Sequence, residues 1–224
     1  LPIARINVPR LAVEYRDESA NVTLSAPALT VDLSSRGRLA LDAPLDLTIG
    51  STSTRIDTLQ SDISFDGRDL QLMNLEFSAP ELRGVIDGML ALIRQHPSID
   101  VRVVSDSELQ NAAKWWGQAD DAPRGSVHLE GTVSGPLSEP TANLQLSSNG
   151  ISWQRLDVAN VAARIQLNGD SLEVGESSAG IAGGSVAATG GLTWQDNRAR
   201  VDASWRDLDA ARLLTTIGGA SVSP

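Results

Sequence analysis

The sequence predicts a mainly β protein of antiparallel strands with one apolar face, together with two short helices. In residues 161–167 every second side chain is apolar, and similar short alternating segments recur along the chain. Turn-forming residues separate these segments, as Asn168–Asp170 does after the first of them. Only two stretches have the three-to-four residue spacing of a helix.

Composition and charge narrow the classes of function. The 224 residues carry a formal net charge of −10, which argues against nucleic acids and anionic lipid head groups as partners. There is no cysteine, so neither a disulfide framework nor a thiolate metal site is expected. No run of about 18 apolar residues exists to cross a bilayer. Because no signal peptide begins the chain, we expect an excised piece of a longer protein.

The first part of the chain predicts many short strands. Alternating segments follow one another from Ile6 to Ile49, with prolines between segments, where a missing N–H does not interrupt a strand ladder. Residues 85–93 are apolar on both parities, which predicts cover on both sides. Ile99, Val101 and Val103 form the last strand before the pattern changes.

A hairpin is predicted in the middle of this part. Ile63 and Phe65 precede the turn 66–69, and Leu70 and Leu72 follow it. The apolar phase then slips by one residue, which predicts a β-bulge near Met73-Asn74.

The two predicted helices close two blocks of strands. Residues 107–110, Ser-Glu-Leu-Gln, have the form of a capping box, and a helical face runs from Leu109 to Trp116 before Gly117 ends it. The second helix is capped by Asp207, carries its apolar residues between Ala210 and Ile217, and ends at glycine.

The second part opens new strands after a polar connector. Val127, Leu129 and Val133 begin it, glycines and prolines punctuate it, and Leu144, Leu146, Ile151 and Trp153 continue it. A run of hairpins then extends to Trp205, with a further turn at Asp196-Asn197.

The two parts resemble repeats. Gly67 matches Gly169, 102 positions later, and the apolar residues around both glycines coincide. We expect a first block at 1–117, a connector at 118–124, a second block at 125–219 and a tail at 220–224. Tandem blocks of strands closed by a small helix favour an elongated, stackable architecture.

Three segments carry a resemblance to a known family. Residues 131–140, Gly-Thr-Val-Ser-Gly-Pro-Leu-Ser-Glu-Pro, are similar to the recurring Gly-x-Val-x-Gly-x-Leu-x-x-Pro segment of the AsmA-like superfamily, within it the TamB type. Residues 168–172 stand in that family's hairpin position, and 208–214 look like its short helix. Block 125–219 is covered well. The first block lacks the glycine-rich entry and carries Trp115-Trp116 instead.

The resemblance implies a fold and a role. The fold is a β-taco, an elongated, curled antiparallel sheet with an apolar concave interior. The role is phospholipid transport between the inner and outer membranes of a Gram-negative bacterium, or assembly of outer-membrane proteins. It also implies a periplasmic location, an inner-membrane anchor in the full-length protein, and an outer-membrane assembly partner of the BamA/TamA type.

Small aliphatic side chains dominate the apolar set, which leaves room for acyl chains of phospholipid. We expect no catalysis, no cofactor and no metal. The candidate groove-lining residues are Ile63, Phe65, Leu70, Leu72, Val101, Val103, Val127, Leu129, Leu144, Leu146, Val161, Ile165, Leu167, Leu172, Val174, Val186, Leu192, Trp194, Val201 and Trp205.

Other interpretations compete with a groove. The same alternation also fits an ordinary closed core, and exposed sheet edges fit a scaffold or chaperone that pairs with nascent outer-membrane strands. A parallel β-helix enzyme ranks last, because coils with a period of about 20 to 30 residues and clustered carboxylates are lacking. His96 and His128 have no ligand spacing, and Asp120-Asp121 reads as a solvated connector. Trp115-Trp116 fits a helix packed on the sheet edge, a cap on the groove or a contact with a membrane partner.

Overall fold

A computed structural model of the chain describes residues 5–8, 11–16, 21–26, 29–32, 37–49, 52–66, 68–91, 96–112, 122–154, 156–193, 198–209 and 211. The prediction of a mainly β protein is confirmed, and these residues include one short helix, α1. The elements are β1 (Arg5–Val8), β2 (Leu11–Arg16), β3 (Asn21–Ala26), β4 (Leu29–Asp32), β5 (Gly37–Leu41), β6 (Leu45–Ile49), β7 (Thr52–Ile56), β8 (Thr58–Phe65), β9 (Asp69–Ser78), β10 (Leu82–Ala91), β11 (Ser98–Glu108), α1 (Leu109–Ala112), β12 (Ser126–Pro136), β13 (Thr141–Trp153), β14 (Leu156–Asn168), β15 (Ser171–Ile181), β16 (Gly184–Thr193) and β17 (Arg198–Arg206).

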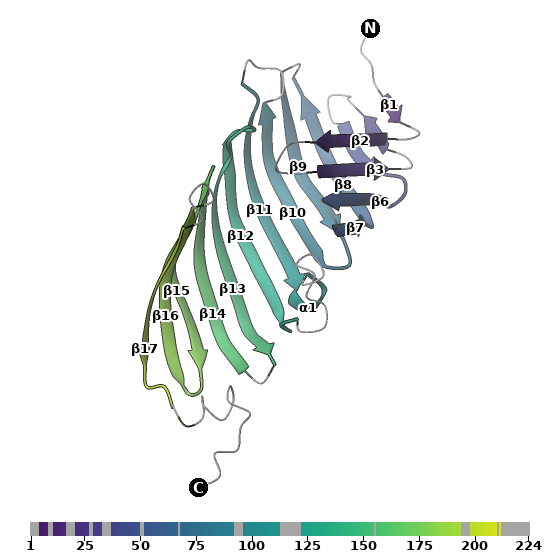
Figure 1. Ribbon diagram of the computed structural model, residues 1–224. Helices are drawn as coiled ribbons and strands as arrows, with labels where there is room; N and C mark the ends of the chain where they lie inside the picture. The colour runs from purple at the N-terminus through teal and green to yellow at the C-terminus, as the bar shows by residue number, and fades with distance from the viewer. Residues whose placement is uncertain are drawn as a thin grey trace. The chain divides into compact units, whose positions relative to one another are not determined.

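The strands form one large antiparallel sheet and one small one. The large sheet has thirteen strands in the order β1-β4-β5-β8-β9-β10-β11-β12-β13-β14-β15-β16-β17, and the small sheet has the order β2-β3-β6-β7 (Figure 1). Backbone contacts divide the chain into two compact units. Unit 1 comprises Leu1–Asp106 and Thr132–Pro140, and unit 2 comprises Ser107–Gly131 and Thr141–Pro224.

Unit 1 has a small buried core on β8 and β9. Ile63, which is 2% exposed, lies directly opposite Leu72, and Leu75 packs with them. The predicted bulge is confirmed, because the β8–β9 register shifts there and Asn74 has a φ of 49°. The bulge returns Leu75 to the face of Leu72, so the core continues past the phase slip.

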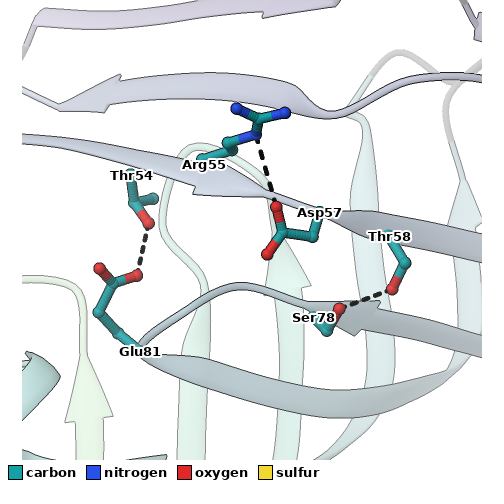
Figure 2. Close-up of polar contacts among 6 residues, drawn as sticks. All are labelled: Thr54, Arg55, Asp57, Thr58, Ser78 and Glu81. Atoms are coloured by element: carbon teal, nitrogen blue, oxygen red, sulfur yellow. Dashed lines mark hydrogen bonds and ion pairs between the residues drawn. The ribbon is translucent and has the colours of Figure 1, made fainter.

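In unit 1 the chain passes from the small sheet to the large one at Asp57. The Asp57 amide donates to the carbonyl of Ser78 at 2.8 Å, and the hydroxyls of Thr58 and Ser78 are 2.7 Å apart. Figure 2 shows the Thr58–Ser78 contact, together with the ion pair of Arg55 with Asp57 and the hydrogen bond from Thr54 of β7 to Glu81. The end of β7 and the start of β8 are thus fixed against the turn between β9 and β10.

Unit 2 is built from hairpins with tight turns. Gly169-Asp170 joins β14 to β15, as the sequence predicts, and Gly169 has a φ of 45°. Ala182-Gly183 joins β15 to β16, and Ala182 has a φ of 49°, a region that alanine rarely adopts. In the β14–β15 hairpin Ile165 lies opposite Val174, and in the β8–β9 hairpin Ile63 lies opposite Leu72. Both residues of the second pair lie 102 positions before those of the first, so the two hairpins have the same register around their turns.

Three expectations need correction or fall outside the described residues. The capping box is wrong, because β11 continues through Ser107 and Glu108, and the Leu109 amide that begins α1 donates to the carbonyl of Gly125 at 2.9 Å. Two helices are not confirmed: the helix expected to reach Gly117 is described only over four residues, and residues 210 and 212–217 of the other lie outside the described ranges. Cover on both sides of 85–93 is incomplete within β10, because Met89 is 39% exposed.

Residues 194–197, with the expected turn at Asp196-Asn197, and residues 113–121, with Trp115-Trp116 and Asp120-Asp121, are not among the described ones.

Candidate functional site

The apolar residues of β13 to β17 share one face of the sheet. Residues directly opposite each other in an antiparallel pair point to the same side. Leu144 lies opposite Ile165, Ile165 opposite Val174, Val174 opposite Gly190, and Gly190 opposite Val201. This row crosses five strands without a charged residue. We call the side on which it lies the apolar face of unit 2.

Three further rows extend this face along the strands. They are Ala142–Leu167–Leu172–Leu192–Ala199, Leu146–Ala163–Ser177–Ala188–Ala203 and Ala179–Val186–Trp205. The side chains in them are mostly alanine, valine and leucine, so the face is apolar but low in relief. Such a surface offers dispersion contacts to a flexible hydrocarbon and few features that would select one molecule.

Bulges keep the face apolar along the full strands. The β14–β15 and β15–β16 registers both shift past Gly175-Glu176, so two consecutive residues of β15 leave the face and Ser177 returns to it. Asn160 of β14, with a φ of 50°, marks another shift, beyond which Val158 lies opposite Ile181. Without these bulges, strict alternation would place the apolar residues at the ends of these strands on the polar face.

Cover of the apolar face decreases from β13 toward β17. Ala142 of β13 is buried, Ile165 and Val174 are half-buried, and Val201 and Trp205 of β17 are 74% and 67% exposed. All strands of unit 2 that the structure describes belong to one sheet, so no second sheet of that unit covers the face. Exposed apolar area of this kind marks a site for another molecule more often than it marks ordinary surface.

The exposure of alanines shows which face of the sheet is better shielded from solvent, because side chains of the same size are compared. Ala162 and Ala187 are exposed, whereas their chain neighbours Ala163 and Ala188, on the apolar face, are half-buried. The side chains of the apolar face therefore screen one another from water. The opposite side of the same strands is more open to solvent at these positions.

The opposite, polar face of unit 2 carries an open depression of about 1070 Å³. Gly175 and Gly191 line it without side chains, and its other lining residues include charges of both signs. Two of these lining residues form an ion pair, with Arg200 Nε and Asp202 Oδ2 2.8 Å apart. The lining residues are Arg164, Gln166, Glu173, Val174, Gly175, Glu176, Thr189, Gly190, Gly191, Thr193, Arg198, Ala199, Arg200 and Asp202. Three of the lining residues are arginines and three are acidic, so the depression has no dominant charge to attract an ion.

The candidate groove residues fall into three groups by exposure. Buried residues belong to packed positions and offer little surface: Ile63, Leu72, Val101 and Val127. Half-buried residues are Leu70, Val103, Leu129, Leu144, Leu146, Val161, Ile165, Leu167, Leu172, Val174 and Val186. Exposed residues are Phe65, Leu192, Val201 and Trp205. Trp194 lies outside the described residues.

The candidate groove residues leave out the small members of the apolar face, although the predicted alternation includes Ala163, Ala188 and Ala203. Ala163, Ala179, Ala188 and Ala203 lie in its rows beside the larger residues. Alanine on its own is a weak signal because it occurs on both faces, as Ala162 and Ala163 demonstrate.

Within the described ranges, no group of three or more His, Cys, Asp and Glu residues is arranged to hold a metal ion. His96 is exposed and lies before the start of β11, and His128 is half-buried within β12. A search of the same residues finds no helix with the length and apolar character needed to cross a membrane. The chain matches no known protein family, no curated protein and no solved structure.

Proposed function

We propose that the apolar face of unit 2 binds the acyl chains of phospholipids, in a periplasmic segment of a TamB-type, AsmA-like protein. In this proposal the full-length protein is anchored in the inner membrane and moves phospholipid between membranes, or assists an outer-membrane assembly partner of the BamA/TamA type, without catalysis or a cofactor. The supporting observation is the continuous apolar surface across β13 to β17, which is only partly covered.

The size of the face suits a hydrocarbon chain. Strands of 13 residues such as β13 and β14 extend about 40 Å at roughly 3.4 Å per residue. An acyl chain of about 16 carbons, at about 1.3 Å per bond, is shorter than this span. Neighbouring strands lie about 4.8 Å apart, so several acyl chains fit side by side on five strands.

The energetics favour passage over tight capture. Each CH₂ group gains about 0.8 kcal/mol on leaving water, so a bare acyl chain in water is strongly disfavoured. Transfer between a bilayer and an apolar protein surface changes this term little. Half-buried alanine and valine side chains, together with Gly190 in the row from Leu144 to Val201, leave the surface smooth. Such a surface removes the aqueous barrier without holding the lipid in one place.

Adjacent alanines provide a matched test. Ala163→Asp and Ala188→Asp each place a charge on the apolar face, and Ala162→Asp and Ala187→Asp place the same charge on the polar face of the same strands. Phospholipid that copurifies with the chain is quantified by mass spectrometry, and binding of an apolar fluorescent dye is titrated. We expect the first pair to lose most bound lipid and to bind dye at least about fivefold more weakly. A bound acyl chain or dye would cover the new carboxylate and remove its hydration, which is costly.

The control pair should bind as the parent does. Equal effects of both pairs, with the fold intact by circular dichroism, would place binding elsewhere than on the apolar face. Absence of lipid in the parent protein together with unchanged dye binding in all four variants would refute the proposal.

A second candidate is a scaffold that binds nascent outer-membrane strands without lipid. The full exposure of β17 favours it, because a strand with an accessible edge can add a further strand. Photo-crosslinks from β17 to an outer-membrane protein, in preparations free of lipid, would support this candidate over the first.

A further inference from the structure

Strand β17 is hydrogen-bonded to β16 and ends the order of the described sheet (Figure 1). All nine of its residues are exposed. Val201 and Trp205 point to the apolar face, and Arg200 and Asp202 to the polar face, as their pairing with β16 requires. The charged residues of β17, Arg198, Arg200, Asp202 and Arg206, all lie on the polar face. The strand has no proline, no inward charge on its apolar face and no register shift against β16, so it lacks these devices that hinder pairing at a sheet edge.

We propose that β17 pairs antiparallel with β17 of a second copy of this chain, with Val201 opposite the second copy's Val201. In this register each Arg200 lies opposite the second copy's Asp202, twice by symmetry. Ala199 then lies opposite the second copy's Ala203, on the apolar face. Opposite charges directly across an antiparallel pair are stabilising, and like charges are destabilising.

Neighbouring registers are less favourable. Centring the pair on Asp202 places two carboxylates opposite each other and Arg198 opposite Arg206. Centring it on Arg200 or on Ala203 juxtaposes arginines, Arg200 with itself or with Arg206. A two-fold axis requires residues of the same parity to lie opposite each other. Among the two-fold symmetric registers that bring seven or more β17 residues into pairs, the Val201-centred one alone avoids like charges.

The proposed pairing keeps the faces aligned. Residues of the same parity meet, so apolar residues lie opposite apolar ones, and the symmetry axis is perpendicular to the sheet. The apolar faces of the two units 2 then form one wider surface. The exposed Val201 gains a valine neighbour across the strands. The pairing does not depend on lipid, so it is measured with delipidated protein and can fail without affecting lipid binding.

A charge-swap series tests the register. Arg200→Asp and Asp202→Arg each bring like charges together across the interface, and the double variant restores two opposite pairs with reversed sense. Sedimentation equilibrium at several concentrations gives the dimer dissociation constant. We expect about 10-fold weaker dimers in each single variant and a return to within about threefold of the parent in the double variant. Asp170→Arg, in the β14–β15 turn, controls for a change of charge away from the edge.

A cysteine provides a second measurement, because the chain contains none. In the proposed register Val201→Cys brings two thiols directly opposite each other, and mild oxidation should cross-link most of the dimer. Ala203→Cys places its thiol opposite the second copy's Ala199 and should cross-link at least about fivefold less. A monomer at all concentrations, equal cross-linking of both variants, or a double variant as weak as the single ones would overturn the proposal. So would capture of an unrelated strand by β17 in place of a second copy.

Discussion

The hydroxyl of Thr54 donates a 2.7 Å hydrogen bond to Oε2 of Glu81, a carboxylate whose residue is only 8% exposed (Figure 2). Thr54 belongs to β7 of the small sheet, and Glu81 to the turn between β9 and β10 of the large sheet. A carboxylate withdrawn from water needs hydrogen-bond donors to offset its lost hydration. This contact therefore helps to fix the point in unit 1 at which the chain passes from one sheet to the other.

Removing the Thr54 hydroxyl should lower the stability of unit 1. Thr54→Val keeps the shape of the side chain and deletes the donor, and we expect the free energy of unfolding to fall by about 2 kcal/mol. Thr58→Val is the matched control, because the Thr58–Ser78 hydrogen bond is exposed and its loss should cost less than about 0.5 kcal/mol. Urea unfolding followed by circular dichroism measures both.

All five tryptophans fall within the residue ranges of unit 2, and the two that the structure describes are Trp153 and Trp205, so tryptophan fluorescence provides an internal reference for the Thr54 experiment. The fluorescence transition should not move in either variant if the two units unfold separately. Equal losses of stability in Thr54→Val and Thr58→Val would show that the Glu81 contact contributes no more than an exposed hydrogen bond.

Local chemistry made much of this fold predictable. The Met73-Asn74 bulge and the Gly169-Asp170 turn follow from the phase of neighbouring apolar residues and from the φ angles that glycine and asparagine accept. The capping box failed for a related reason. Its Ser-x-x-Gln pattern is short, and strand pairing of β11 overrides a local helix signal.

The degree of cover was not predictable from the sequence. Ile63 and Val201 both stand in apolar alternation, yet one is buried and the other largely exposed. Alternation identifies a face, but pairing between distant strands decides what lies over it. The four-stranded sheet β2-β3-β6-β7 shows the same limit. In it β3 pairs directly with β6, although β4 and β5, which follow β3 in the sequence, belong to the other sheet.

Equivalent isoleucines in the two hairpins should differ in their contribution to stability. Ile63 packs in the core of unit 1, and Ile165, 102 positions later, is half-buried on the apolar face of unit 2. Ile63→Ala should cost about 3 kcal/mol because it leaves a cavity, and Ile165→Ala about 1 kcal/mol because its surroundings are already open. Urea unfolding measures the two losses, and equal losses would show that Ile165 is packed as tightly as Ile63.

Gly131 of β12 should not tolerate a side chain. A Cβ at this position would lie 2.0 Å from the carbonyl oxygen of Asn143 and 2.8 Å from the Cα of Leu144. Backbone atoms cannot move aside easily, so Gly131→Ala should lower the stability of unit 2 by about 2 kcal/mol or more. Gly150→Ala is the control, because the nearest atom to its Cβ would be 3.8 Å away. Tryptophan fluorescence follows the unfolding, and a silent Gly131→Ala would require β12 and β13 to lie farther apart.

Asp66 should make unit 1 less stable in acid. Its Oδ1 accepts hydrogen bonds from the backbone amides of Asp69 at 2.8 Å and Arg68 at 2.9 Å, and these lower the pKa of the carboxyl below its ordinary value of 3.8. A group whose pKa is lower in the folded chain stabilises the fold above its unfolded pKa. This contribution is lost as the pH falls through the folded pKa.

Asp66→Asn isolates this effect, because the amide oxygen still accepts hydrogen bonds but does not titrate. The difference in unfolding free energy between the parent and Asp66→Asn should be constant above about pH 5 and should change in favour of the variant below the ordinary pKa of 3.8. All other carboxylates are common to both proteins, so their titration cancels in the difference. A difference that stays constant down to pH 2 would contradict the proposal that the amides of Arg68 and Asp69 lower the pKa of Asp66. So would a carboxyl resonance of Asp66 that titrates at or above 3.8 in NMR.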